Sequence, residues 1–474
     1  MLTSSLGHVS VTEVDGTTFT GLYAADGSLN VYDATSDTVP NGLYHPCGAM
    51  NITITDGTTL TGRYANNGSL YVVIDSTEYG VYHSCGAMNI TGITVSLAEE
   101  LLGSETDGLA IVAEDMTLVI RDTATPANAF SGDANTKLTY TSPSTKYILN
   151  SSGVYEAGTT LRCEYDTSGN PLGIRIEETR TNVVLHNRDL TNAVWTKSNV
   201  TAAKDQVGID GVTNSASSLT ATAGNATCLQ AITLASSARY QSTFIKRISG
   251  SGVIQMTMDN GTTWTAVTVT SSWTPVEIPT QTLANPTVGF RIVTSGDAIA
   301  IDMVMNENGA YRTSPIATAG ATVTRFVDDI SLSGTLFPLS TTQGILSIRM
   351  QYIASNVSGN CGVGLYGPNT QNLADLRATQ MLVSSANVAQ AILVAGSLNT
   401  SMNRRSLSYA TNDFAGTFNG GTVVTDVSGS TPVTLTILRL HIGSTSIPLN
   451  GHLNKLLYLP RNRASNAELQ GFLA

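Results

Sequence analysis

The sequence has few charged side chains. Lys, Arg, Asp and Glu make up 12% of its 474 residues, whereas soluble proteins contain about 25%. Because Lys and Glu favour the exposed faces of helices, their scarcity argues against a helical bundle. Small, hydroxyl-bearing and turn-forming residues are abundant instead. This composition predicts an all-β protein with many turns.

The chain also lacks an excess of positive charge and any long apolar segment. Its net charge of −11 would repel nucleic acid, so we expect no nucleic-acid partner. The first residues, MLTSSLGHVSVTEVDG, contain neither the basic nor the apolar region of a secretory signal. Apolar stretches such as AQAILVAGSL are too short to span a bilayer, so we expect no membrane insertion. These features predict synthesis in a cytoplasm without a secretory route.

Cysteines are few and odd in number. The five are scattered over a chain whose length suggests about three domains. An odd, scattered set is not a disulfide framework. The cysteines are Cys47, Cys85, Cys163, Cys228 and Cys361.

Residues 15–91 contain an internal duplication. The stretch DGTTFTGLYAADGSLNVYDATSDTVPNGLYHPCGAMNIT is followed by DGTTLTGRYANNGSLYVVIDSTEYGVYHSCGAMNIT. Asp-Gly and Asn-Gly pairs separate short alternating runs in both copies, which is typical of β-hairpins. Each copy therefore predicts a small β-meander. A unit of about 40 residues buries little surface, so we expect the copies to pack on each other or on other subunits.

Each copy of the repeat ends in a His-x-Cys pair. His45, Cys47, His83 and Cys85 are four ligands of the types that zinc accepts. Buried structural packing explains the pairs better, because alternate residues of a strand share one face and Cys is often buried. We expect packing, with the four residues as weak candidates for a metal site.

Two short helices interrupt the β-structure. In SLAEELLG, Ser96 is the expected N-cap and Gly103 the stop of a connector helix. In ASNAELQGFLA, Ser465 and Glu468 predict a second capped helix. Short strands with turns every 8–12 residues fill residues 181–325, and alternation resumes after Asp328. This spacing predicts two consecutive β-sandwiches.

Several phrases resemble a family of bacteriophage virion proteins. In that family, phrases similar to IEETRTNVVLHNRDLTNAVWTKSNVT and YRTSPIATAGATVTR begin and end a jelly roll of the carbohydrate-binding-module type. The C-terminal GHLNKLLYLPRNRASNAELQ resembles the last strand and helix of a concanavalin-like lectin domain, and the N-terminal repeats resemble units of similar phage proteins. The resemblance implies a virion surface protein and defines no ligand.

The resemblance and the pattern together predict four segments. Residues 1–95 form the duplicated β-repeat segment for virion docking and oligomerisation, and residues 96–179 form a connector helix and β linker. Residues 180–327 form a carbohydrate-binding-module-like jelly roll, and residues 328–474 form a concanavalin/LamG-like β-sandwich. The fold class is therefore all-β, with duplicated meanders, two sandwiches and one short connector helix.

We expect no enzymatic activity. A glycan-cleaving site needs two carboxylates about 5–10 Å apart. Glu177 and Glu178 are adjacent, so on a strand they would point to opposite faces, and we expect them to anchor the jelly roll, with Arg180 as an ion-pair partner. The candidate carboxylates are Glu164, Asp166, Glu177, Glu178, Asp302 and Glu307.

Trp264 and Asn260 are the candidate ligand-binding residues. Sugar sites place an aromatic face against the sugar, with polar groups on its hydroxyls. Trp264 lies close to the Asn260-Gly261 turn, whereas Trp195 and Trp273 lie in phrases of the family framework and are expected in the core. No cofactor is expected, although Ca²⁺ at Asp189 or Asp302 is an alternative that similar modules suggest.

These features lead to three hypotheses. The first is a tail fibre or spike component, located in the virion, that contributes to attachment through host cell-surface glycans. It contacts other virion proteins and forms a homo-oligomer, for which a trimer is expected because fibres favour it. The second is a capsid decoration or head-fibre protein without a receptor role. The third is a glycan-cleaving tailspike.

Overall fold

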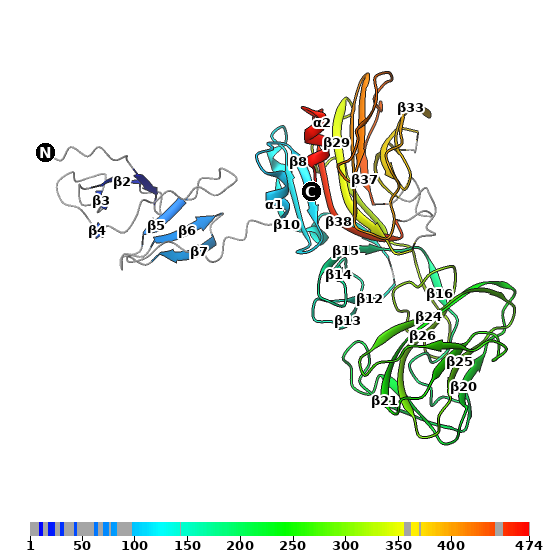
Figure 1. The fold of residues 1–474 in the computed structure, drawn as a ribbon. Helices are drawn as coiled ribbons and strands as arrows, with labels where there is room; N and C mark the ends of the chain where they lie inside the picture. Colours follow the sequence, from blue (N-terminus) through cyan, green and yellow to red (C-terminus); the bar gives the residue numbers. More distant parts are fainter. Residues whose placement is uncertain are drawn as a thin grey trace. The chain divides into compact units, whose positions relative to one another are not determined.

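The protein is nearly all β. The computed structural model describes residues 9–12, 18–23, 29–32, 42–44, 61–64, 70–74, 77–82, 97–142, 144–354, 362–368, 371–440 and 449–473. The chain divides into two compact units, Met1–Ser104 and Glu105–Ala474 (Figure 1). No helix in the described ranges is long and apolar enough to cross a membrane. The predicted all-β class is confirmed.

In the first unit, each copy of the repeat forms a three-stranded antiparallel meander. The first copy pairs β2 with β3 and β3 with β4, and the second pairs β5 with β6 and β6 with β7. The predicted meanders are therefore confirmed. The strands are β1 (Val9–Thr12), β2 (Thr18–Tyr23), β3 (Leu29–Tyr32), β4 (Gly42–Tyr44), β5 (Thr61–Tyr64), β6 (Leu70–Ile74) and β7 (Thr77–Tyr82).

A short helix, α1 (Leu97–Leu102), closes the first unit. Gly103 follows it with a φ of 52°, a left-handed conformation that glycine adopts without steric cost at a helix end. The expected connector helix is therefore present. Its expected N-cap, Ser96, lies outside the described residues.

Two five-stranded sheets form the jelly roll of the second unit (Figure 1). Their inner faces enclose an apolar core that includes Trp195, Phe290 and Ile301. One sheet, in spatial order, is β17 (Thr196–Ser198), β20 (Ala226–Ala231), β25 (Thr287–Ile292), β22 (Ile254–Thr257) and β23 (Thr265–Val267). The other is β18 (Val200–Gln206), β19 (Ala216–Ala221), β26 (Ala298–Asn308), β21 (Ser237–Ser249) and β24 (Thr274–Leu283).

The jelly roll begins and ends at one point. Strand β16 (Arg180–Asn182) pairs antiparallel with β27 (Val323–Arg325), so the two phrases that suggested its start and end lie side by side. The chain enters and leaves the domain through this two-stranded ribbon. Residues on both sides of the ribbon are therefore held next to the neighbouring sandwich.

The C-terminal sandwich packs a ten-stranded sheet against a seven-stranded one around a single apolar core. The path through the larger sheet is β10 (Phe130–Asp133), β9 (Thr117–Arg121), β8 (Gly108–Val112), β38 (Gly451–Leu459), β29 (Gln343–Tyr352), β34 (Asn403–Ala410), β35 (Asp413–Phe418) and β36 (Val424–Asp426). The smaller sheet is β11 (Thr139–Thr141), β28 (Asp329–Ser333), β37 (Ile437–Arg439), β30 (Gly362–Tyr366), β31 (Leu373–Arg377), β32 (Met381–Ser385) and β33 (Val388–Leu393).

Residues 105–179 were expected to be a linker, but they contribute strands to the larger sheet. Strands β8 and β15 (Pro171–Ile176) both pair with the C-terminal strand β38, and β14 (Cys163–Tyr165) pairs with β15. Gly173 permits this contact, because a Cβ there would lie 2.3 Å from the Leu453 carbonyl oxygen. The segment therefore completes the larger sheet before the chain enters the jelly roll.

The remaining short elements lie at the edges of this sandwich. Strands β12 (Lys146–Leu149) and β13 (Tyr155–Gly158) form a hairpin. Helix α2 (Asn466–Gly471) begins at Ser465, whose hydroxyl accepts a hydrogen bond from the Glu468 backbone N–H, as the capping pattern predicts. Two single-turn 3₁₀ helices, Pro126–Asn128 and Ala134–Thr136, flank β10.

Candidate functional site

A cleft of about 1020 Å³ lies within the second unit. Three stretches of the chain line it: the segment around the β12–β13 hairpin and β14–β15, the outer face of the jelly roll, and the ends of β29 and β38. Its size is at the upper end of the range of about 300–1000 Å³ for small-molecule sites. Its aromatic lining residues are Tyr155, Tyr165, Tyr240, Phe244, Trp273, Tyr311 and Tyr352.

The alternation of β21 produces the apolar wall of the cleft. Ile245 points into the jelly-roll core, so Phe244, one residue earlier, points out of the other face of the sheet. There its ring meets the ring of Tyr155 edge to face, with centroids 5.0 Å apart. Trp273, immediately before β24, packs against the same cluster and is half-buried. The wall therefore joins the jelly roll to the β12–β13 hairpin.

An ion pair lies beside the aromatic wall. The Arg312 Nε lies 2.9 Å from a Glu277 carboxylate oxygen as an ion pair, and the Tyr240 hydroxyl donates to the other oxygen. The Glu277 side chain is 36% exposed. Donors and acceptors therefore face the cleft next to one another, an arrangement that suits the hydroxyl groups of a sugar.

A second, buried group of polar side chains closes another side of the cleft. Glu164 accepts from Arg175 Nη1 at 2.8 Å, and its carboxylate lies 2.6 Å from His452 Nε2. Burial alone would raise the pKa of Glu164, but the charge of Arg175 and the contact with His452 lower that pKa to about 2. Glu164 is therefore a fixed carboxylate and no proton donor at neutral pH.

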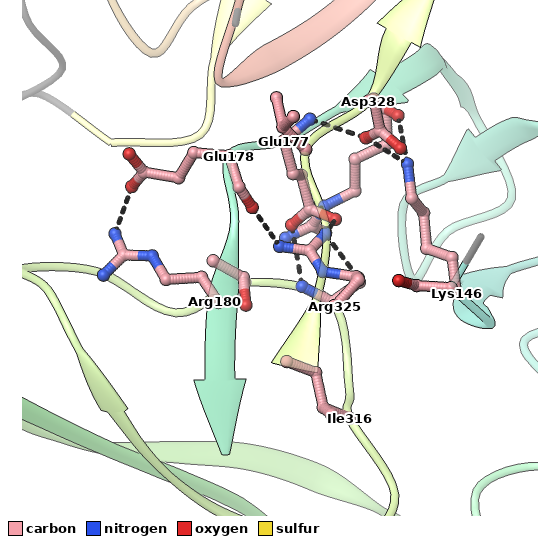
Figure 2. A network of polar contacts seen from close by, with 12 residues as sticks. Lys146, Glu177, Glu178, Arg180, Ile316, Arg325 and Asp328 are labelled. Atoms are coloured by element: carbon pink, nitrogen blue, oxygen red, sulfur yellow. Dashed lines mark hydrogen bonds and ion pairs between the residues drawn. The ribbon is translucent and has the colours of Figure 1, made fainter. Parts of the chain in front are cut away.

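A network centred on the fully buried Glu177 lies behind this group (Figure 2). Glu177 accepts from Arg325 and from the Ser314 backbone N–H, the latter at 2.7 Å, and forms an ion pair with Arg175 Nε at 2.8 Å. Burial would raise the pKa of Glu177, but the two arginines lower it far below its usual range. This network connects β15 to the end of the jelly roll.

Asp328 extends the network toward the C-terminal sandwich, as Figure 2 shows. It accepts from Lys146, from the Glu177 backbone N–H at 2.7 Å and from the Tyr140 hydroxyl at 2.8 Å. Residues of the hairpin, the strand β15 and the β27–β28 connection therefore share one set of charges. This arrangement fixes the elements that line the cleft.

Glu178 has the same kinds of partner as Glu277 but lies outside the cleft lining. It pairs with Arg180 and accepts from the Tyr311 hydroxyl at 2.6 Å. Gly309 makes room for this pair, because a Cβ there would lie 1.4 Å from Arg180 Nη1. The expected pairing of Glu178 with Arg180 is thus found.

Comparisons with known proteins add little to this geometry. No family model and no curated protein matches the sequence. Among solved structures, the chain is similar to the N-terminal CBM22-1–CBM22-2 tandem domain from Paenibacillus barcinonensis Xyn10C, with 9% identity and a TM-score of 0.21 over 59% of this chain and 99% of that one. It is also similar to the extracellular region of zebrafish Gpr126/Adgrg6, with 10% identity and a TM-score of 0.20 over 58% of this chain and 37% of that one. Likenesses of this size say nothing about the ligand of this chain.

The candidate ligand residues Trp264 and Asn260 do not line the cleft. Trp264 immediately precedes β23, in the opposite sheet of the jelly roll. Its half-buried ring lies over Gly261, and the Arg291 guanidinium carbon is 4.4 Å from the ring centroid. Asn260 is exposed in a turn with a φ of 61°. A ligand-binding role for these two residues stays a prediction.

The six candidate carboxylates are separated into different surroundings. Glu164 and Asp166 line the cleft, whereas Glu177 and Glu178 belong to the network behind it. Asp302 and Glu307 are buried in the jelly roll, where burial raises their pKa despite their partners Arg188 and Thr313. The carboxyl groups with a raised pKa therefore do not line the cleft.

The four metal candidates of the repeats stay a prediction. His45, Cys47, His83 and Cys85 lie outside the described residues. Within the described ranges no group of three or more His, Cys, Asp or Glu side chains could hold a metal ion. For the suggested calcium, both oxygens of Asp302 already accept from Arg188, and Asp189 accepts from Thr191.

Sequence reasoning missed Trp273, Tyr240, Glu277 and Arg312 as cleft residues. Trp273 was expected in the core because SSWTPVEI matches a framework phrase; it instead lies half-buried on the outer face of the sheet. Trp195, expected in the core on the same ground, is 1% exposed. A signal was present in YRTSPIATAG, which places Tyr311 and Arg312 just after the long strand β26.

Proposed function

We infer that this chain is a structural component of a bacteriophage particle, a tail fibre or spike, and that its cleft binds a saccharide of the host surface. The phrases at the start and end of the jelly roll and at the C-terminus support the virion assignment. In this proposal the N-terminal repeats dock onto other virion proteins, and copies assemble into a homotrimer. The cleft is the observation that carries the binding function.

The lining of the cleft supports a saccharide as its ligand. Trp273, half-buried on the wall, offers apolar ring surface, which matches the apolar faces of a sugar. Glu277 and Arg312 stand beside them with an acceptor and donors in fixed positions. A small number of polar groups in fixed positions on an apolar wall orients a small ligand.

The carboxylates support binding without cleavage. A glycosidase needs one carboxyl group that stays protonated near neutral pH and a second that is ionised. On the cleft wall, Glu164 is held ionised by Arg175, and Glu277 is paired with Arg312 and accepts from Tyr240. Asp166 accepts from the backbone N–H groups of Ser168 and Asn170.

A pair of tryptophan variants tests the proposal in the full-length protein. Trp273→Ala is expected to weaken binding to host-cell surface polysaccharide at least tenfold, since it removes the largest aromatic surface of the cleft. Trp264→Ala is the matched control, because Trp264 is also half-buried beside a basic side chain. Calorimetric titration measures the affinity, and circular dichroism checks that both variants fold.

The outcomes separate the three hypotheses. Loss of binding in Trp264→Ala and full binding in Trp273→Ala would move the site to the other sheet. If the protein did not bind host polysaccharide but bound capsids tightly, the hypothesis of a capsid decoration protein would replace that of an attachment protein. Release of reducing ends from the polysaccharide would establish a cleaving enzyme.

A further inference from the structure

We propose that the cleft selects an uncharged saccharide and disfavours its acidic counterpart. The inference rests on the proposed function, because it specifies the ligand class of the same cleft. It starts from the charged side chains on the wall and from the partners that each of them already has.

Both arginines on the wall are already paired. Arg312 Nε forms an ion pair with Glu277 at 2.9 Å, and Arg175 donates to Glu164 at 2.8 Å and forms an ion pair with Glu177 through Nε at 2.8 Å. Recognition of a ligand carboxylate relies on an arginine whose paired N–H groups are free to form two parallel bonds. An acidic sugar would have to share its arginine with a carboxylate of the protein.

The charge balance of the wall points the same way. The lining contains three carboxylates (Glu164, Asp166 and Glu277) and two arginines (Arg175 and Arg312). The whole chain carries a net charge of −11. A ligand carboxylate would therefore enter a site without excess positive charge. It would lose part of its hydration without an electrostatic gain.

One further cation, Lys246, lies beside the cleft. Its ammonium nitrogen is 4.8 Å from the centroid of the Trp273 ring, so one face of the indole already stabilises it. Lys246 is not a lining residue. With it included, the charges near the cleft only balance, which still favours a neutral ligand.

Hydroxyl groups, in contrast, match what the wall offers. The Glu277 carboxylate and the Arg312 guanidinium present acceptor and donor groups next to one another, and both are partly exposed. A hydroxyl can donate to the first and accept from the second without breaking the ion pair. Neighbouring hydroxyls of a neutral sugar therefore fit the pair as it stands.

Matched oligosaccharides test the proposal. The probes are tetrasaccharides of glucose, galactose and mannose, each paired with the counterpart in which C6 is a carboxylate. Calorimetric titration of the full-length protein is expected to give at least tenfold tighter binding for the neutral member of a pair that binds. Equal or tighter binding of the acidic member would overturn the selectivity and leave the proposed function standing. If neither the probes nor host polysaccharide binds, the proposed function fails.

A charge-release variant sharpens the test. Glu277→Gln keeps the shape of the side chain but frees Arg312, so the preference for the neutral member is expected to shrink at least tenfold. Added salt should restore part of this preference, because the new attraction is electrostatic. Glu178→Gln is the matched control, since Glu178 also has an arginine and a tyrosine partner but lies outside the cleft lining. An unchanged preference in Glu277→Gln would contradict the proposal.

Discussion

Glu177 and Glu277 are both carboxylates paired with arginine, but their surroundings differ. The Glu177 side chain is fully buried between Arg175 and Arg325, whereas the Glu277 side chain is 36% exposed on the cleft wall beside Arg312. The first pair connects strand β15 to the end of the jelly roll. The second faces the space in which we propose that a ligand binds.

The difference shows what burial does to the same chemistry. A buried carboxylate cannot regain water when its partner is lost, so its pairs are kept and hold neighbouring segments in place. A partly exposed pair contributes little to stability, because both of its charges remain in contact with solvent. The protein therefore has one set of charges that maintains the cleft and another that is available to recognise a ligand.

The largest effect is expected from removal of the buried carboxylate. Glu177→Ala leaves Arg325 and Arg175 without their shared acceptor, and such losses cost about 3–5 kcal/mol. Urea denaturation measures the free energy of unfolding. Glu277→Gln serves as the control and is expected to cost less than about 1 kcal/mol. If the two variants lost equal stability, burial would not distinguish the two pairs.

A smaller effect is expected from acid, through Glu164. Because its pKa in the folded protein is lowered from 4.5 to about 2, its ion pair contributes fully above pH 4.5 and is lost as the pH falls toward 2. The shift corresponds to roughly 3 kcal/mol at neutral pH. Urea denaturation at a series of pH values between 6 and 2 measures this loss.

Glu164→Gln provides the comparison for the acid effect. The variant is expected to be less stable at pH 6 and to lose less stability between pH 4.5 and pH 2, because the group that titrates is gone. A slope identical to that of the unaltered protein would assign the acid sensitivity to other carboxylates. Glu177, whose pKa is also lowered, would be the next to examine.

Local features of the fold could be predicted from the sequence. The cap of α2 depends only on Ser465 and Glu468, three residues apart, and it forms as expected. The meanders also follow from turn pairs and alternation within about 40 residues. Physical rules that act over a few residues are thus sufficient for these elements.

Long-range pairing could not be predicted in the same way. Strand β8 pairs with β38 through Leu109 and Tyr458, and no pattern in either strand identifies the other. The alternation of β21 tells that Phe244 and Ile245 face opposite sides, but not that the hairpin residue Tyr155 covers the outer one. The cleft is made by such contacts, so Trp273 was assigned to the core and its neighbours were missed.

The smallest effect is expected at Glu156, which is more exposed than Glu177, Glu164 and Glu277. Its side chain is 54% exposed, and it lies 3.5 Å from Arg162 Nη1. Glu156→Gln should change the free energy of unfolding by less than about 1 kcal/mol, because solvent replaces the lost contact. The amide can still accept from Asn150, which donates to Glu156 at 2.6 Å. Urea denaturation of Glu156→Gln and Glu177→Ala under the same conditions measures the difference in their free energies of unfolding. If Glu156→Gln lost as much stability as Glu177→Ala, ion pairing would stabilise this protein regardless of burial. The division between structural and recognition charges would then no longer hold.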